Sequence, residues 1–420
     1  MSQRFQAPKG TRDLLPPDTE LWAAVEQIAR EVFGRYGFRE IRTPVFEETE
    51  LFARGVGESS DIVGKEMYSF VDKGERSLTL RPENTASVVR AYVEHGMSRL
   101  PSPVKLFYIG VQFRYERPQK GRYRQFHQIG AELLGGRGAE SDAEVLLMLV
   151  AFLRALGFTD LKVMLNTVGD ESSRSAYKAR LLTFLTSHRE MLSEESVRRL
   201  ATNPLRILDS KSPAEQELLN GAPRLQDSLS DGSRSHFAAV CSALDQFGVT
   251  YEISPRLVRG LDYYTNTVFE IVSEGLGSQN AICGGGAYEG LVEELGGPPT
   301  YGVGFAIGED RLIDVLPADS PARRRAPGPV VVTSSEKLLV KDGELSPVFA
   351  LVERLRRSGV PAVEGAGKTE KILERALASR SPCILQIGRG SELLIRWLAD
   401  GRREPVDETE LMRKLRELYL

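Results

Sequence analysis

Cysteine is scarce in this sequence, and its few copies lie far apart. The 420 residues include three cysteines, none of which belongs to a C-x-x-C pair: Cys241, Cys283 and Cys383. This pattern excludes a disulfide framework and a thiolate zinc site, and it fits a reduced cytosolic protein. The four histidines show no H-E-x-x-H or other ligand spacing. We therefore expect no metal held mainly by protein side chains.

Long apolar runs are also missing. The longest run, VLLMLVAFL at 145–153, is too short to cross a bilayer. The first residues, MSQRFQAPKGTRD, contain no apolar stretch of the kind that secretory signals carry. We therefore expect a cytoplasmic protein without a membrane partner. The formal net charge of −3 argues against a surface that binds nucleic acid everywhere, and it remains compatible with a local basic groove.

The sequence does contain clear strand and helix patterns. Segments near 104–116 and 124–135 alternate apolar and polar residues, as strands do, and together they predict a hairpin. The segment 38–52 alternates as well, but Pro44 makes it an edge strand or a strand end. A capping box at 141–144 predicts the start of the next helix.

Composition divides the chain into parts. From about 170 to 245, charged helix-forming stretches dominate, which indicates a helical insertion. The segment 317–329, rich in proline, alanine and arginine, indicates an interdomain linker. Residues 329–420 alternate strands and helices, as an α/β domain does. The predicted fold class is α+β: an antiparallel sheet flanked by helices, with a helical insertion and a C-terminal α/β domain.

The hairpin places unlike residues on its two faces. Its turn region, RYERPQKGRYRQFHQ at 114–128, holds five cationic residues and one acidic residue. Because side chains alternate along a strand, one face is apolar and the other shows arginine, glutamate, phenylalanine and glutamine together. That face is either a salt-bridged, solvated surface or a floor for a planar base and a polyphosphate. Arginine suits phosphate because its planar fork donates two parallel hydrogen bonds.

The hairpin also carries a resemblance to a known family. FRYERPQKGRYRQFHQIGAE resembles motif 2 of class II aminoacyl-tRNA synthetases, in the form found in histidyl-tRNA synthetases. LVRGLDYYTNTVFE at 257–270 resembles the histidine-specific segment of that family, and GFAIGEDRL at 304–312 resembles motif 3. GFREIRTPVFEETELF resembles motif 1, which builds the dimer interface. KGTRDLLPP, TLRPENTA and NPLRILDSK also match bacterial members, so the resemblance covers essentially the whole chain.

The resemblance implies a fold and an activity. It makes 1–322 a class II catalytic domain that contains the insertion, and it makes 329–420 an anticodon-binding domain. The implied reaction uses ATP, with Mg²⁺ on its phosphates, to join L-histidine to histidine tRNA through histidyl-adenylate. AMP and pyrophosphate are released. The implied assembly is a homodimer.

The resemblance also implies roles for single residues. The residues implied for histidine are Glu83, Asn84, Thr85, Arg114, Gln128, Glu132, Arg259, Tyr263, Tyr264 and Tyr288. Those implied for ATP are Arg114, Glu116, Arg122, Phe126 and Arg311. Arg114 and Arg259 would be the catalytic residues, because they would lie at the carboxylate and the α-phosphate. Gln119 and Lys120 would meet the acceptor end of the tRNA.

Three positions depart from the usual pattern of the family. Asn266, Ala287 and Glu289 stand where arginine, arginine and aspartate are common. Two rival interpretations of the chain stay open. One is a non-catalytic paralogue, such as the regulatory subunit of ATP phosphoribosyltransferase, which lacks the anticodon domain. The other is a general RNA-binding module, which would bind tRNA without selectivity.

Overall fold

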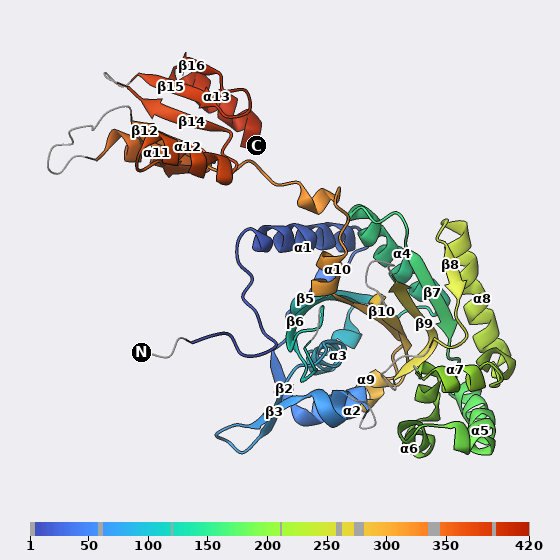
Figure 1. Ribbon diagram of the computed structural model, residues 1–420. Coiled ribbons are helices and arrows are strands. Elements are labelled where there is room, and N and C mark those ends of the chain that lie inside the picture. Colours follow the sequence, from blue (N-terminus) through green and yellow to red (C-terminus); the bar gives the residue numbers. More distant parts are fainter. Residues whose placement is uncertain are drawn as a thin grey trace. The chain divides into compact units, whose positions relative to one another are not determined.

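The chain, drawn as a ribbon in Figure 1, folds into two compact units, Met1–Arg323 and Arg324–Leu420. Each unit has its own hydrophobic core. None of the helices in the described residues combines the length and the apolar character that a membrane span requires. The computed structural model describes residues 5–57, 62–118, 121–210, 212–257, 263–272, 281–334, 345–388 and 392–419.

An eight-stranded sheet forms the centre of the first unit. The inner strands run antiparallel to one another, and the two short edge strands run parallel to their neighbours. This antiparallel-rich sheet, flanked by helices, confirms the predicted fold class. The strand order is β1 (Arg39–Glu40), β5 (Val104–Phe113), β6 (Gln125–Leu134), β11 (Gly302–Gly308), β10 (Ala281–Tyr288), β9 (Tyr264–Val272), β7 (Lys162–Thr167) and β8 (Tyr251–Ile253).

One face of this sheet is the core of the unit. Phe107, Ile129 and Phe305, from three adjacent strands, are buried there against the apolar stripes of two helices. These helices are α1 (Asp18–Arg35) and α4 (Ala139–Ala155). The odd-numbered residues of the hairpin therefore point into the core, as the alternation of its sequence predicts.

Two elements begin elsewhere than predicted. The helix α4 begins at Ala139, so Ser141 lies inside it; its hydroxyl accepts a hydrogen bond from the Arg137 N–H (2.8 Å) and caps no later turn. The segment 38–52 is not one strand. It contains β1, then β2 (Phe46–Glu48), and then the start of α2 (Thr49–Val56). Alternation over so short a stretch fits both a strand and a helix, which is why the sequence misled here.

A second layer covers part of the other face of the main sheet. It holds a three-stranded sheet, in the order β2, β4 (Ser77–Leu80) and β3 (Tyr68–Val71). Beside it pack α2, α3 (Thr85–Glu94) and α9 (Leu291–Glu294). Leu134 of β6 is buried with side chains of α3 and α9, so these helices lie over the face opposite the core.

The chain leaves the main sheet after β7 and returns to it at β8 (Figure 1). The residues between these strands form a helical insertion with its own buried cluster, which includes Tyr177, Leu181 and Leu185 and also takes in Val268 of β9. The insertion helices are α5 (Glu171–Ser187), α6 (Glu194–Thr202), α7 (Pro213–Leu219) and α8 (Asp231–Gln246).

The connection between the two units is shorter than the predicted linker of 317–329. Residues Pro321–Arg323 form a 3₁₀ turn against α1, and Ala322 is 3% exposed within the core of the first unit. The boundary between the units follows Arg323. Composition alone did not distinguish this docked turn from the segment after it.

The second unit is an α/β domain around a five-stranded sheet. Leu351 and Leu415 belong to its larger core, and Ile372 belongs to a smaller one. The strand order is β13 (Ala362–Glu364), β12 (Val330–Ser334), β14 (Cys383–Ile387), β15 (Leu393–Trp397) and β16 (Arg403–Val406). The helices are α11 (Pro347–Arg357), α12 (Thr369–Ala378) and α13 (Glu408–Tyr419).

The N-terminal segment is bound to the hairpin and to the helix α10 (Glu309–Asp314). Arg12 Nη2 lies 2.8 Å from Asp310 Oδ1, and the His127 N–H donates to Asp310 Oδ2 (2.9 Å). The Arg124 N–H donates to the Gly10 carbonyl (2.7 Å). Asp310 therefore joins two segments that are distant in the sequence to the start of α10.

Glu309, beside Asp310, is a buried acid without a partner. It is 0% exposed, and neither carboxyl oxygen has a hydrogen-bond partner in the described part of the chain. Burial raises its pKa well above the usual value, and the charges of Glu26 and Asp310 raise it further. The folded protein therefore keeps Glu309 protonated, whereas the unfolded chain ionises it above about pH 4.3. Stability from this group is present below that pH and is lost as the pH rises.

We expect Glu309→Leu to raise the free energy of unfolding by about 1–3 kcal/mol at pH 8, because it removes an unpaired buried polar group. The gain should be smaller at pH 5, where less ionisation accompanies unfolding. Urea unfolding at both pH values measures it. The exposed Glu31→Leu on α1 is the control and should change stability by less than about 0.5 kcal/mol. A loss of stability, or an equal gain at both pH values, would contradict this account.

Candidate active site

Glycines leave open space on the second face of the main sheet, opposite the core. This open part of the sheet, around Gly286 and Gly304, is the floor of the candidate site. Glu132 of β6 lies opposite Gly304 of β11, which lies opposite Gly286 of β10. A Cβ at Gly304 would be 1.9 Å from Glu132 Oε2. A Cβ at Gly286 would be 2.8 Å from Cδ1 of Tyr264. Glycine is therefore required at both positions, because any larger residue would displace the side chain that stands on the floor.

Glu132 is held by two hydroxyl groups. Thr85 Oγ1 donates to Oε1 (2.7 Å), and the Tyr288 hydroxyl donates to Oε2 (2.7 Å). The residue is 1% exposed. Burial raises the pKa of Glu132 to about 8, although both hydrogen bonds lower it. This carboxyl group therefore changes its charge near neutral pH, and a ligand that donates an N–H to it would favour the ionised form.

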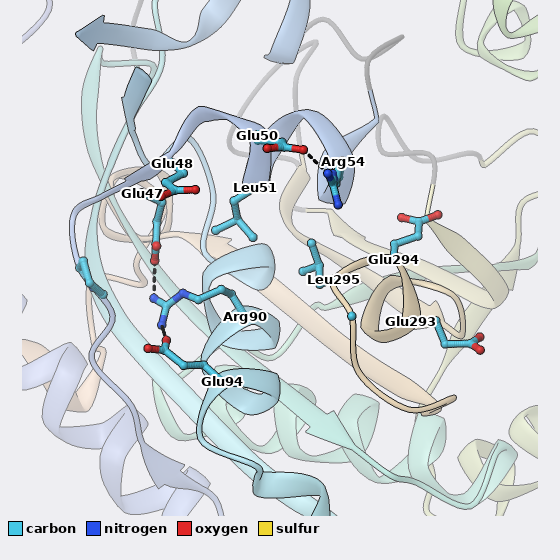
Figure 2. Close-up of a pocket in the computed structure, with 12 residues that line it drawn as sticks. Glu47, Glu48, Glu50, Leu51, Arg54, Arg90, Glu94, Glu293, Glu294 and Leu295 are labelled. Atoms are coloured by element: carbon cyan, nitrogen blue, oxygen red, sulfur yellow. Dashed lines mark hydrogen bonds and ion pairs between the residues drawn. The ribbon is translucent and has the colours of Figure 1, made fainter. Parts of the chain in front are cut away.

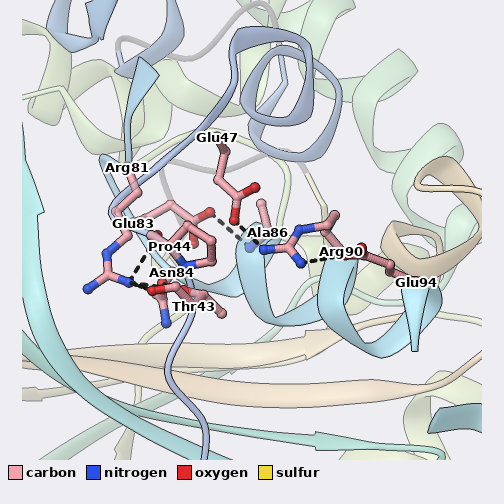
Figure 3. Close-up of polar contacts among 9 residues, drawn as sticks. All are labelled: Thr43, Pro44, Glu47, Arg81, Glu83, Asn84, Ala86, Arg90 and Glu94. Atoms are coloured by element: carbon pink, nitrogen blue, oxygen red, sulfur yellow. Dashed lines mark hydrogen bonds and ion pairs between the residues drawn. The ribbon is translucent and has the colours of Figure 1, made fainter. Parts of the chain in front are cut away.

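Glu83 occupies the N-terminus of α3. Its carboxylate accepts hydrogen bonds from the backbone N–H groups of Thr85 (2.6 Å) and Ala86 (2.9 Å), the second of which is drawn in Figure 3. A helix N-terminus offers unpaired N–H groups and favours negative charge. Burial nevertheless raises the pKa of Glu83. Thr85 binds both acids, through its backbone and its hydroxyl, and so fixes Glu83 relative to Glu132.

Arg81 is a buried residue to which the sequence analysis gave no role. Its guanidinium donates to the carbonyl and hydroxyl oxygens of Thr43 (3.0 and 2.9 Å) and to the Val111 carbonyl (2.9 Å). The Thr43 hydroxyl in turn donates to Asn84 Oδ1 (2.8 Å) (Figure 3). Arg81 thus attaches the motif 1 segment to the start of α3. The sequence indicated a role for Arg81 only in that it belongs to TLRPENTA, a segment that matches the family.

Three tyrosines border the acidic pair. The rings of Tyr263 and Tyr264 lie 4.7 Å apart, and those of Tyr263 and Tyr288 lie 5.6 Å apart, edge to face. Burial, followed by the charge of Glu132, raises the pKa of Tyr288 well above its usual value. Its hydroxyl therefore remains a hydrogen-bond donor at neutral pH.

Three arginines lie near the connection between β5 and β6, at the turn end of the hairpin. Arg114 Nε donates to the Pro82 carbonyl (2.8 Å), and its guanidinium lies 5.3 Å from the Phe126 ring centre. Arg311 Nε donates to the Gly121 carbonyl (3.2 Å). Burial lowers the pKa of Arg311, and the nearby charges of Arg122 and Arg114 lower it further. Like charges held this close indicate a site for an anion.

Arg122 pairs with Glu116 at 3.0 Å. The charges of the two residues therefore partly neutralise one another. The resemblance implies a phosphate contact for Arg122 and an adenine contact for Glu116. A phosphate at Arg122 would compete with this ion pair.

Several buried polar atoms on this face have no hydrogen-bond partner among the described residues. Buried polar groups are nearly always paired, so these atoms indicate where a polar ligand or water binds. Tyr108 and Gln112 had no predicted role, although the alternation of β5 puts both on the face of Gln128. The atoms are Asn84 Nδ2, Tyr108 Oη, both amide atoms of Gln112, and Gln128 Oε1.

The structure brings the predicted residues that it describes into two adjoining groups. Glu83, Thr85, Glu132 and the three tyrosines form the acidic group; Arg114, Arg122 and Arg311 form the arginine group. Arg114 joins the two, because it binds the carbonyl of Pro82, next to Glu83. Gln128 lies between Gly110 and Gly308 on neighbouring strands. The predicted residues Arg259, Gln119 and Lys120 lie outside the described residues.

A separate cavity of about 870 Å³ lies near the second layer (Figure 2). Arg90 of α3 donates to Glu47 and to Glu94 at its wall. The cavity contains none of the predicted site residues, so it is not the candidate active site. Its lining residues are Pro44, Glu47, Glu48, Glu50, Leu51, Arg54, Arg90, Glu94, Glu293, Glu294, Leu295 and Gly296.

Comparison with known proteins identifies the family of the chain. The family model of histidyl-tRNA synthetase matches residues 10–312. A histidine–tRNA ligase of Thermosynechococcus vestitus is 46% identical over 414 residues, which cover 97% of this chain and 95% of that protein. One of Desulfitobacterium hafniense is 50% identical over 361 residues, which cover 85% and 84%. The crystal structure of apo histidyl-tRNA synthetase from S. aureus is 33% identical, with a TM-score of 0.80 over 98% of this chain and 100% of that one. The chain belongs to the histidyl-tRNA synthetase family.

Proposed function

We propose that this chain activates L-histidine with ATP and transfers it to histidine tRNA. The observation that carries the proposal is that the acidic group, built around Glu132, and the arginine group adjoin, because Arg114 donates to the Pro82 carbonyl next to Glu83. Family membership supports the same reaction. Histidine-dependent exchange of pyrophosphate into ATP tests the first step, and charging of histidine tRNA tests the second.

The acidic group provides the histidine site. Glu83, Thr85 and Gln128 would bind the α-amino group, with Asn84 beside them. Glu132 and Tyr264 would bracket the imidazole, because a buried carboxylate accepts its N–H. Tyr263 and Tyr288 would shape the pocket around the ring. An amino acid without imidazole nitrogens would leave these buried groups unpaired. The site would therefore favour histidine over such an amino acid by about 10⁴-fold or more.

The arginine group provides the ATP site. Phe126 would stack on adenine, and Glu116 would accept from its amino group. Arg122 and Arg311 would bind the outer phosphates, and Arg114 the α-phosphate. Arg259 would lie across the α-phosphate and the histidine carboxylate. Burial and then the charges of Arg122 and Arg114 lower the pKa of Arg311, and a bound polyphosphate would offset the repulsion among these charges.

In the first step, a carboxylate oxygen of histidine attacks the α-phosphorus of ATP. The bond to the bridging oxygen breaks, and pyrophosphate leaves with its electron pair. Fixed cations aimed at the phosphorus stabilise the developing charge, and alignment of the two reactants contributes most of the rest. In the second step, a ribose hydroxyl at the 3′ end of the tRNA attacks the adenylate carbonyl, and AMP leaves.

We propose that Mg²⁺ arrives with ATP and neutralises phosphate charge. Among the described residues, no group of three or more His, Cys, Asp or Glu is placed to hold a metal ion. A site made mainly of arginines also repels a free cation. These observations support phosphate oxygens, and not a protein cage, as the ligands of the ion.

The second unit supports an aminoacyl-tRNA ligase over a regulatory paralogue, which lacks such a domain. We propose that it binds the anticodon. Its charge is nearly balanced, with 16 basic and 14 acidic residues between 330 and 420, so any RNA contact must use a local patch. Gln119 and Lys120 would meet the acceptor end. Charging of histidine tRNA alone, among several tRNAs, separates this function from general RNA binding.

We also propose a cytoplasmic homodimer. The three cysteines form no disulfide, and two of them are buried, which supports a reducing compartment. The three-stranded sheet of motif 1 exposes Phe46 (48%), Phe70 (44%) and Val71 (68%). The rings of Phe46 and Phe70 are 6.5 Å apart, so they form a patch. Exposed apolar patches of this kind indicate a protein–protein contact.

The pH dependence of histidine binding tests the role of Glu132. Its pKa is about 8, so the ionised form that accepts an imidazole N–H grows as the pH rises from 7 to 8.5. We expect the histidine concentration at half-saturation in the exchange reaction to fall about eightfold over this pH range. The whole range lies above the pKa of free imidazole, about 6.5, so titration of the substrate ring contributes little. Glu132→Gln should raise the half-saturation concentration by about tenfold or more and remove the pH trend. The same trend in both proteins would refute the role.

Removal of the second unit separates the two steps. A chain that ends at Arg323 retains the main sheet, its core and the docked 3₁₀ turn. We expect it to keep histidine-dependent pyrophosphate exchange within about threefold of the full chain, and to charge histidine tRNA at least about 100-fold more slowly, because the tRNA loses its second point of attachment. Undiminished charging would show that the unit does not bind tRNA.

A charge placed in the exposed patch tests the dimer. We expect Phe70→Asp to shift the protein from dimer to monomer in analytical ultracentrifugation, because an unpaired carboxylate would be buried at the contact. The control is Phe247→Asp, which changes an exposed phenylalanine (62%) just after α8. If Phe70→Asp sediments as the parent does, the patch is not the interface.

A further inference from the structure

The segment that leads into β9 is held by the helical insertion. Arg174, in the first turn of α5, donates from Nη1 to the backbone carbonyl of Tyr264 (2.7 Å). Nη2 of the same guanidinium pairs with Glu171 on the same helix. A hydrogen bond from a charged donor to a carbonyl is among the stronger ones, so this contact fixes the backbone of a pocket residue from outside the pocket.

Asn266, two residues further along, is held from a second insertion helix. Ser233 of α8 donates to Asn266 Oδ1 (3.4 Å), and Asn266 Nδ2 donates to Glu289 Oε1 (3.2 Å), just after β10. Ser233 also accepts from the Asp170 N–H, at the start of α5 (2.9 Å). Asn266 and Glu289 are two of the three positions that depart from the family pattern, and here they bind one another.

The backbone at Asn266 is irregular, so its conformation depends on contacts with neighbouring elements. Its φ of +47° lies in the left-handed region, which asparagine tolerates better than most residues. Gly286 pairs with Val268, whereas the next residue, Ala287, pairs with Thr265, so β9 carries two extra residues at this point. Asn266 instead exchanges backbone hydrogen bonds with Val168 and Gly169, which follow β7 (2.7 and 2.9 Å).

A shift in this segment would reach the histidine site directly. The Tyr264 ring stands on Gly286, and Tyr263 contacts both Tyr264 and Tyr288. The Tyr288 hydroxyl donates to Glu132. A displacement of about 1 Å in a reacting group can reduce a rate about 100-fold, so a small movement here would be felt in histidine binding.

We propose that Arg174 and Asn266 are positioning residues for the histidine pocket, through which the helical insertion sets the place of Tyr264. The insertion then acts in the amino-acid step, in which no tRNA takes part. This inference rests on the proposed function. It predicts that a change in α5 alters the response to histidine and leaves the response to ATP unchanged.

The test is pyrophosphate exchange without tRNA, in the full chain. Arg174→Met should raise the half-saturation for histidine about tenfold, by loss of one charged hydrogen bond, and leave that for ATP within about twofold. Arg174→Lys should recover part of the loss, because an ammonium group can donate to the same carbonyl. The control is Arg180→Met, on the same helix, whose guanidinium donates to Ser228 (2.9 Å) and not to β9.

Asn266→Gly and Asn266→Ala test the second contact. Glycine keeps the left-handed backbone and loses only the side-chain bridge, whereas alanine loses both, so alanine should raise the histidine half-saturation more than glycine. A parent chain without histidine-dependent exchange would overturn the proposed function itself. If the parent is active, then an unchanged histidine half-saturation in Arg174→Met, or an equal loss towards ATP, overturns the positioning role alone. Should Arg174→Met not fold, the same comparison on Arg174→Lys and on the Asn266 pair decides.

Discussion

The site depends on keeping two carboxyl groups, those of Glu132 and Glu83, in the interior of the protein. Taking a carboxylate out of water is costly unless hydrogen bonds replace its hydration. Each receives two donors, and Thr85 supplies one to each acid. The glycine floor leaves the space that Glu132 needs. The position of α3, and hence of the layer that carries it, follows from this requirement.

The acidic group lies at one end of the floor and the arginine group at the other, so the two ends of the site differ in chemistry. Under the proposed function, the amino group of the histidine zwitterion would lie at the acidic group and its carboxylate near Arg114. The same arginine lies where the two groups meet. A polyphosphate drawn to Arg122 and Arg311 would then approach the carboxylate from the other end. Under the proposed function, this arrangement of charge would favour the two reacting centres lying next to one another.

Much of the site could be predicted because it lies in one hairpin with regular alternation. Parity placed Gln112, Gln128 and Glu132 on one face, and the pairing of β5 with β6 agrees. The partners of these residues come from distant segments, and no local pattern reveals them. The bonds from Arg81 to Thr43 and from Arg174 to Tyr264 join residues 38 and 90 positions apart. Composition likewise could not show that Ala322 is buried.

The chemistry of the three departures was also hidden in the sequence. Asn266 and Glu289 lie 23 positions apart in the sequence, but in the structure their side chains bind one another, and Asn266 itself has a left-handed backbone. Asn266, in place of arginine, and Glu289, in place of aspartate, therefore belong to a single local arrangement. The third departure, Ala287, is fully buried in the core, where a charged side chain would not fit the described packing.

The bond between Arg12 and Asp310 spans 298 positions, and it has a consequence for how the protein is made. Contacts of such high sequence separation form late in folding. During synthesis the first twelve residues leave the ribosome long before β11 and α10 exist. The nascent chain must therefore hold its N-terminal arm unpaired through most of translation, and the arginine group is completed shortly before the second unit emerges. An incomplete chain that stops within the insertion would carry the hairpin but could not close the floor around it.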